Sequence, residues 1–213
     1  MHARRADREI VDPVQLTAIL RHEVLLHLGL LTPEGNPYVV PLNYGLSEDG
    51  KTLYLHGASA GKKLDCIRHH SQVSFDVTQR RRLAVQVDPY CRSTTKFTSV
   101  MGAGEATRLT DPAEKMEAFS VIMAHIMTYE GLLKEPVVPG GGDLVLTTGP
   151  QAGPLPDPVA AGYRQAEERF RAQLAHVRAT LPGQTGMEGV VAQTAIMRIA
   201  LTQLTGKTNG HFD

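Results

Sequence analysis

The sequence has few cysteines and no excess of charge of either sign. Its two cysteines, Cys66 and Cys91, match no metal or redox spacing. So small a number is typical of a reducing compartment. The 22 Lys and Arg residues balance the 22 Asp and Glu residues, so no overall field favours nucleic acid or a membrane surface. We therefore expect neither of these as a partner.

Long apolar runs and several well-known motifs are also missing. The longest apolar runs fall short of the about 20 residues that a membrane-spanning helix needs, and residues 1–9 are too charged for a signal peptide. The sequence has no Walker A motif, no G-x-G-x-x-G after a strand, no G-x-S-x-G elbow and no paired-histidine zinc spacing. We expect a cytoplasmic protein with no metal site and with neither NTPase activity nor a stably bound dinucleotide.

Alternating apolar residues predict about seven antiparallel strands. They fall at residues 24–31, 37–46, 53–56, 72–78, 83–87, 95–109 and 192–204. The run Arg80-Arg81-Arg82 is expected to form the turn between the fourth and fifth strands. Pro41 removes a hydrogen-bond donor from the second strand. That strand therefore lies at a sheet edge, is bulged, or turns its backbone toward a ligand.

Several amphipathic helices accompany the strands. Two begin at Asp12-Pro13 and Asp111-Pro112, where Asp is a good N-cap and Pro suits the first helical position. Another carries apolar residues at spacings of three or four, and it follows a Gly- and Pro-rich loop at residues 131–158. These elements predict a single domain, residues 1–213, in which the loop and the extra helix occupy about 131–189. Its fold class is mainly β: a small closed or split antiparallel barrel with packed helices.

Residues 53–65 combine a strand, a tight glycine turn and the start of a helix. Gly61 permits the turn, and Ser59 is a good N-cap type. Lys62 and Lys63 then fall in the first helical turn, where the helix dipole disfavours cations. A bound anion would reverse that effect. The turn is therefore either a phosphate site or a solvated basic turn.

His56 ends the strand just before this turn. Histidine suits acid–base chemistry, but a histidine satisfied by a local hydrogen bond also fits this position. Asn43 and Tyr44 carry polar atoms on the neighbouring strand. Together with the turn, they would line one face of a barrel.

An ordered set of short motifs resembles a known family. The motifs are Arg4-Arg5-x-Asp7-Arg8-Glu9-Ile10, Pro41-Leu42-Asn43-Tyr44-Gly45, His56-x-Ala58-x-x-Gly61-Lys62-Lys63, Ser99-Val100-x-Gly102-x-Gly104 and Thr205-Gly206-Lys207. In this order the chain resembles the nitroimidazole-resistance (Nim-type) flavoproteins of the pyridoxamine-phosphate-oxidase-like superfamily. The resemblance covers residues 4–128 and 190–209. The region at residues 131–189 is longer and richer in Gly and Pro than the connection that this family implies. It is either a lid over the active site or an insertion.

The resemblance implies an FMN-binding split β-barrel that forms a homodimer, with FMN at the subunit interface. It implies that the turn holds the FMN phosphate, that the strand around Pro41 lies along the isoalloxazine, and that His56 sits close to the ring. The cofactor-binding residues so implied are Pro41, Leu42, Asn43, Tyr44, His56, Ala58, Ser59, Gly61, Lys62, Lys63 and Ser99.

The activity implied by the resemblance is reduction of the nitro group of 5-nitroimidazoles to the amine, which gives antibiotic resistance. In that scheme the flavin carries the electrons, and His56 is the catalytic residue that touches substrate or donates a proton. Tyr44 and Tyr90 would be secondary wall residues. Two alternatives remain: another FMN oxidoreductase of the pyridoxamine-phosphate-oxidase-like type, or a non-enzymatic flavin-binding protein.

Overall fold

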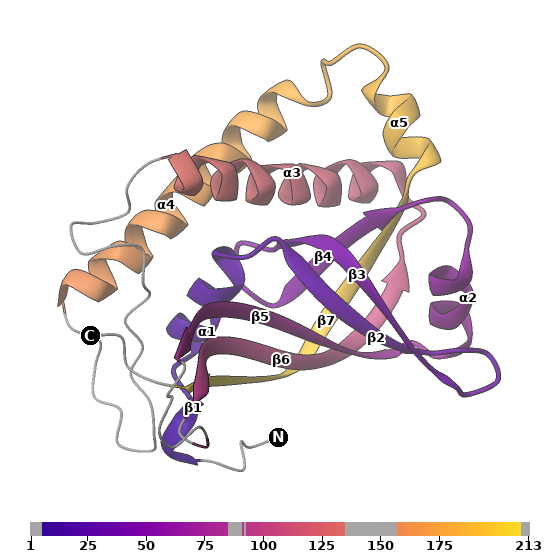
Figure 1. The fold of residues 1–213 in the computed structure, drawn as a ribbon. Coiled ribbons are helices and arrows are strands. Elements are labelled where there is room, and N and C mark those ends of the chain that lie inside the picture. Colours follow the sequence, from indigo (N-terminus) through magenta and orange to yellow (C-terminus); the bar gives the residue numbers. More distant parts are fainter. Residues whose placement is uncertain (1–5, 85–90, 92, 135–156, 210–213) are drawn as a thin grey trace.

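Six strands close into a ring in the computed structural model, which describes residues 6–84, 91, 93–134 and 157–209 (Figure 1). The strands are β2 (Leu25–Leu31), β3 (Pro37–Leu46), β4 (Thr52–Gly57), β5 (Gln72–Ala84), β6 (Thr94–Arg108) and β7 (Ala195–Asn209). The sheet order is β1-β7-β4-β3-β2-β5-β6, and pairing of β6 with β7 closes the ring. A short 3-10 helix, η1 (Ala6–Arg8), leads into β1 (Glu9–Ile10), which adds to β7. All pairs are antiparallel, so the predicted mainly β barrel is confirmed.

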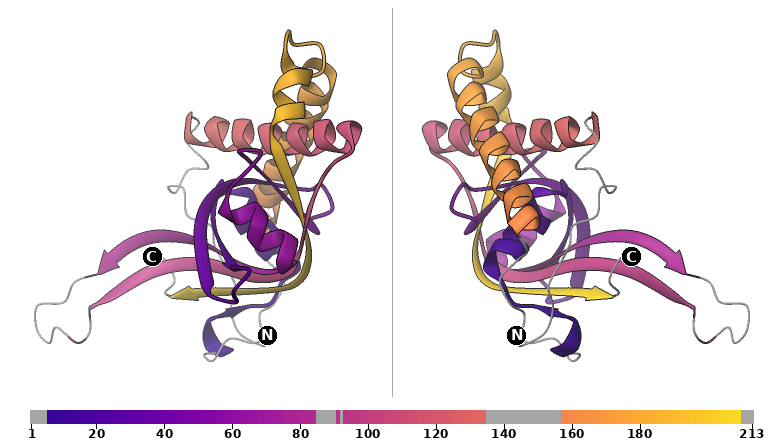
Figure 2. Two further views of the ribbon diagram at one scale, coloured as in Figure 1. Left: turned by 90° about the vertical axis from the view of Figure 1, so that its right-hand side faces the viewer. Right: turned by 90° about the vertical axis from the view of Figure 1, so that its left-hand side faces the viewer.

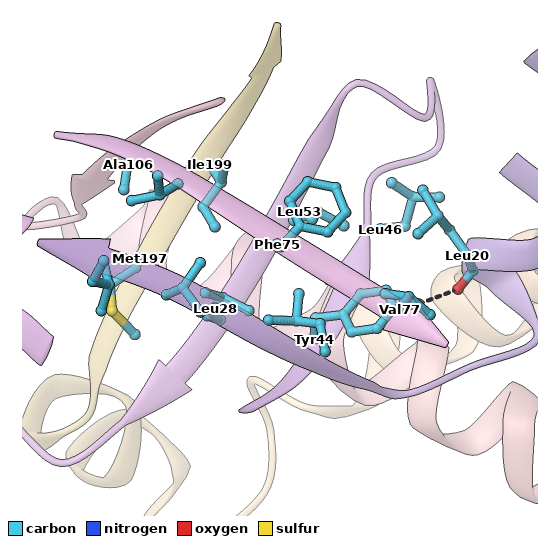
Figure 3. Packing of buried hydrophobic residues seen from close by; sticks show 14 of the residues in the cluster. Leu20, Leu28, Tyr44, Leu46, Leu53, Phe75, Val77, Ala106, Met197 and Ile199 are labelled. Atoms are coloured by element: carbon cyan, nitrogen blue, oxygen red, sulfur yellow. Dashed lines mark hydrogen bonds between the residues drawn. The ribbon is translucent and has the colours of Figure 1, made fainter. Parts of the chain in front are cut away.

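The barrel interior is filled by the inward side chains of each strand. Because strand side chains alternate between faces, Leu53 and Leu55 of β4 are fully buried while Tyr54 and His56 point outward. Phe75, Val77 and Met197 meet them inside the ring (Figure 3). The period-2 pattern was therefore a sound guide to which face of β4 is buried.

Two short helices cover the ends of the barrel. Helix α1 (Pro13–Arg21) begins where expected: Asp12 is its N-cap, and the Asp12 side chain accepts a hydrogen bond of 2.9 Å from the N–H of Val14. Helix α2 (Lys62–His69) covers the opposite end (Figure 1). Its buried Leu64, Cys66 and Ile67 belong to the barrel core, so Cys66 is a core residue.

A helical layer lies across β3 and β4. It consists of α3 (Pro112–Lys134), α4 (Asp157–Thr180) and α5 (Met187–Gln193) (Figure 2). Gly45 of β3 permits the close approach of α3, because a Cβ there would lie only 2.7 Å from the Cα of Ile122. None of the described helices is long and apolar enough to cross a membrane.

A buried polar cluster joins this layer to the barrel. The ring of His125 on α3 accepts a 3.0 Å hydrogen bond at Nδ1 from the N–H of Leu46. Arg21 lies 3.6 Å over the ring of Phe170 and pairs with Glu167, both on α4. It also donates to the carbonyl oxygen of Leu46. Burial lowers the pKa of His125 to about 3, so this histidine is neutral in the folded protein.

The predicted turn at Arg80–Arg82 is wrong. Strand β5 runs without a break from Gln72 to Ala84, with a register shift between Arg80 and Arg82 against β6. The run contains no Gly, Pro, Asn or Asp to favour a turn, and β6 offers partner backbone throughout. The two strands therefore continue past the barrel as a long arm (Figure 2).

Two other boundaries differ from expectation. The last strand was expected at residues 192–204 but runs from Ala195 to Asn209. Helix α5 was missed; it begins after Gly186, whose φ of 79° is a left-handed conformation that glycine adopts easily. The loop expected at residues 131–158 is wrong at both described ends, because residues 131–134 belong to α3 and residues 157–158 to α4. The rest of it, residues 135–156, lies outside the described part of the chain.

Candidate functional site

The β4–α2 turn exposes its backbone at one end of the barrel. Residues 58–61 are exposed, and the N-cap of α2 is Gly61, with φ 131° and no side-chain capping bond. The expected N-cap Ser59 is wrong: residues 59–61 form a bend and the helix begins only after Gly61, so Ser59 stands two residues before the cap. The N–H of Leu64 donates to the carbonyl of Gly61, whereas the N–H groups of Lys62 and Lys63 have no capping side chain and remain available to an anion.

The two lysines of this turn point to different places. A Cβ on Gly57 would lie 2.7 Å from the ammonium nitrogen of Lys63, so this ammonium rests directly over the turn backbone. The ammonium of Lys62 instead lies 4.7 Å from the ring centroid of Tyr38, next to the β2–β3 hairpin. Nothing in the sequence distinguishes the two lysines, but in the structure Lys63 is the one that lies at the start of the turn.

His56 lies on the outer face of β4, between the turn and helix α3. Its ring meets the ring of Phe119 edge to face, with centroids 5.9 Å apart and planes at 85°. Its Nδ1 is buried and has no hydrogen-bond partner. Burial, followed by the charge of Lys63, lowers the pKa of His56. In the structure Nδ1 therefore lacks the local hydrogen bond that the alternative expected.

Strand β3 has an open edge beside this turn. Residues 37–43 of β3 pair with β2 on one side, whereas only Tyr44, Gly45 and Leu46 pair with β4 on the other. Pro41 pairs with His27 without a bulge, so the edge alternative is the one found for this proline. Pro41 and Asn43 are exposed and Leu42 is half-buried. The amide of Asn43 donates a 3.1 Å hydrogen bond to the carbonyl of Val24.

The side chain of Tyr44 belongs to the core, which corrects its expected role as a wall residue. It is fully buried inside the barrel, and its hydroxyl donates a 2.6 Å hydrogen bond to the carbonyl of Leu20 (Figure 3). Asn43 and Tyr44 therefore point to opposite faces of β3, as neighbours in a strand must. The side chain of Tyr44 is therefore not available to a ligand at the outer face, and its N–H donates to the carbonyl of Val24.

Ser99 is not brought to the turn within one chain. It is buried on β6, opposite Thr78 and Lys207. The part of β6 nearest to α2 is at Glu105, which pairs with the first residue of β5. Six strand residues, or about 20 Å, separate Ser99 from that end. Tyr90 lies outside the described residues.

The site also contains residues that sequence reasoning did not assign to it. Phe119 was recognised only as part of an apolar helical stripe, and Tyr38 was not singled out. No local signal marks either one, because both reach the site through the packing of distant elements. Within the described ranges, no group of three or more His, Cys, Asp and Glu side chains could hold a metal ion.

The arrangement suits a flat ligand that carries an anionic group. The exposed turn offers free N–H groups and the Lys63 ammonium, which suit a phosphate. The open edge of β3 offers backbone groups and the exposed Pro41 to a flat ring. His56 presents a ring nitrogen beside both, and its unpartnered Nδ1 is unusual for a purely structural histidine.

Solved structures with the same fold include flavin-binding proteins. The chain is similar to a candidate 5-nitroimidazole antibiotic resistance protein from Bacteroides thetaiotaomicron, at 20% identity and a TM-score of 0.58, over 94% of this chain and 86% of that one. It is similar to the flavocytochrome Anf3 from Azotobacter vinelandii, at 19% identity and a TM-score of 0.61, over 98% of this chain and 72% of that one. It is also similar to an FAD and heme binding protein from Mycobacterium smegmatis, at 12% identity and a TM-score of 0.60, over 96% of this chain and 75% of that one. At these identities the likeness shows the fold.

The family assignment comes from the sequence itself. No curated protein matches the chain. A sequence model of the family described as pyridoxamine 5′-phosphate oxidase matches residues 12–138, more than half of the 213 residues. The match spans α1, β2 to β6, α2 and all of α3, and so includes the β4–α2 turn and His56. The chain therefore belongs to the pyridoxamine 5′-phosphate oxidase family, whose split β-barrel fold it has.

Proposed function

We propose that this protein is an FMN-dependent oxidoreductase that reduces the nitro group of 5-nitroimidazoles to the amine. The observation that carries the proposal is the β4–α2 turn, where the Lys63 ammonium and the free helix N–H groups lie next to His56. The similarity to a candidate nitroimidazole resistance protein supports the choice of substrate. The family supports a flavin as the electron carrier.

In this proposal the turn holds the phosphate of FMN. Ala58, Ser59 and Gly61 supply exposed backbone, and Lys63 supplies the nearest positive charge. Lys62 adds a second charge once it leaves the ring of Tyr38. A terminal phosphate ester is best matched by exposed N–H groups with one or two cations. This is why we propose FMN as the flavin here.

The isoalloxazine would lie along the open edge of β3, against Pro41, Leu42 and Asn43. The flavin supplies the electrons for nitro reduction. The protein binds it, orients the substrate and excludes water. His56 stands between the turn and α3, where it can touch a substrate placed on the ring.

We also propose that a second copy of the chain completes the site. The turn residues and Pro41 are exposed, so a flavin bound to one chain would keep much of its ring in water. The outer faces of β2 and β3 next to it carry exposed Leu25, Leu31 and Val39, and apolar patches of this kind mark interfaces. Ser99 is buried in its own chain and lies far from the turn, so its role in cofactor binding stays a prediction.

The test uses protein loaded with FMN, photoreduced without oxygen and mixed with a 5-nitroimidazole. We expect reoxidation of the flavin, followed by absorbance. Because a reduced FMN carries two electrons and the conversion of a nitro group to an amine consumes six electrons and six protons, the amine is expected under continuous photoreduction with excess electron donor, where mass spectrometry identifies it. Replacing His56 with Ala should slow reoxidation about 100-fold at unchanged FMN content, because one donor at the reacting group is lost. The control His69→Ala removes an exposed histidine of α2 and should react like the wild type.

Three results would contradict parts of this proposal. Reoxidation by other acceptors but not by nitroimidazoles would indicate another FMN oxidoreductase of the family. Bound FMN that never reoxidises with any acceptor would indicate a non-enzymatic flavin-binding protein. A His56→Ala variant with wild-type rate and wild-type FMN content would remove His56 from the reaction.

A further inference from the structure

The imidazole of His56 packs against an aromatic ring from helix α3. The ring of Phe119 meets it edge to face, with centroids 5.9 Å apart. Edge-to-face pairs of this kind favour one orientation of the two rings. Lys63 of α2 lies against Gly57, the next residue of β4, and acts on His56 through its charge. The contact that orients the ring is therefore the one with Phe119.

The two ring nitrogens of His56 have different surroundings. Nδ1 is buried and has no partner, whereas Nε2 is not enclosed in this way. A buried N–H group without an acceptor is rarer in proteins than a buried acceptor without a donor. The proton of the neutral ring therefore belongs on Nε2. Nε2–H is then the group that a ligand meets.

The charged groups around His56 do not favour its protonated form. On α2, Lys63 acts directly on His56, whereas Lys62 faces the ring of Tyr38. The charged residues of α3 and β7 act instead on the neighbouring outward residue of β4, Tyr54: they are Glu114, Glu117 and Arg198. Within the described part of the chain, no carboxylate offsets the burial of His56 or the charge of Lys63.

We propose that His56 serves the site as a neutral hydrogen-bond donor through Nε2–H, with Phe119 as the residue that positions its ring. This inference rests on the proposed function only for the identity of the ligand that His56 contacts. The matching substrate class is a flat molecule that presents an acceptor oxygen, such as a nitro group, to the donor. His56 then recognises and polarises that oxygen, and the protons that complete the reduction come from solvent.

The first test reads the protonation state directly and needs no flavin. In protein with labelled histidine, nitrogen and carbon NMR shifts distinguish the Nε2–H tautomer from the imidazolium. We expect the His56 signals to show the Nε2–H tautomer at neutral pH and to titrate below the usual 6.5. Phe119→Leu keeps an apolar side chain but should broaden or mix the tautomer signals, and Phe119→Tyr should restore them.

The second test separates a hydrogen-bond donor from an acid. The amide of Gln can present an N–H group near the position of Nε2 but cannot carry a titrating proton. In the FMN-loaded protein, His56→Gln should therefore retain at least about ten times more reactivity with a nitroimidazole than His56→Ala. The rate of the wild type should not rise as the pH is lowered toward 6.5.

The outcomes distinguish this inference from the proposed function. An imidazolium at neutral pH, or a His56→Gln variant as slow as His56→Ala, would overturn the role of His56 while leaving the flavin site standing. Unchanged tautomer signals in Phe119→Leu would overturn the positioning role of Phe119. Protein that shows the expected tautomer but binds no FMN would overturn the proposed function and leave the state of His56 established.

Discussion

Loss of Lys62 and Lys63 together is expected to weaken FMN binding by at least about 100-fold. Each charge-assisted hydrogen bond to a phosphate is worth about 1.5–3 kcal/mol, so removing two exceeds that factor. Lys63→Ala alone should cause most of the loss, because its ammonium lies over the turn while that of Lys62 lies over Tyr38. The measurement is a titration of apoprotein followed by flavin fluorescence.

Riboflavin, which lacks the phosphate, gives the matched control for this prediction. Its affinity should change little in the same variants, and Lys51→Ala, which removes an exposed lysine from the β3–β4 hairpin, should leave FMN binding unchanged. Removing cations from the first turn of α2 should also stabilise the free protein by about 0.5 kcal/mol per residue. Equal losses for FMN and riboflavin would show that the turn does not bind phosphate.

Acid should destabilise the folded protein through His125. Its folded pKa of about 3 lies below the usual 6.5. Between these values the unfolded chain binds a proton that the folded chain does not. His125 therefore does not lower the free energy of unfolding above pH 6.5, and this free energy falls as the pH is lowered from 6.5 toward 3. At 1.36 kcal/mol per pH unit, the loss reaches about 3 kcal/mol near pH 4.5.

The measurement is urea unfolding over this pH range in the wild type and in His125→Asn. The amide oxygen of Asn can still accept from the N–H of Leu46, the bond that His125 makes at 3.0 Å, but it does not titrate. The variant starts less stable because Asn is smaller. Its free energy of unfolding should nevertheless fall less steeply with decreasing pH, with a slope that corresponds to about one bound proton fewer. The exposed His176→Asn should keep the wild-type slope. Identical slopes in all three proteins would contradict a neutral His125.

Local patterns in the sequence accounted for much of the fold. The Asp12-Pro13 start of α1, the bounds of β3, the edge position of Pro41 and the burial of Leu53 and Leu55 all follow from properties of single residues or their neighbours. A capping bond, a missing N–H and a period of two each act over a few residues. Such features can be predicted without knowing which elements pack together.

Features set by distant contacts were not predicted. The length of β5 depends on the backbone of β6, which is far along the chain. The burial of Tyr44 depends on an acceptor in α1, the carbonyl of Leu20. The neighbours of His56 come from α2 and α3. The sequence could therefore identify His56 as chemically interesting, but only the packed structure shows the surroundings that keep its ring fixed and neutral.

The central claim is that the β4–α2 turn makes this chain an FMN protein. The most direct measurement is the visible absorption spectrum of the purified protein, followed by identification of any flavin released on denaturation. We predict a flavin spectrum and FMN in the supernatant, or, for protein isolated without cofactor, uptake of added FMN that fails in the Lys62→Ala/Lys63→Ala variant. A colourless protein that takes up no FMN, or one that releases FAD alone, would contradict the account.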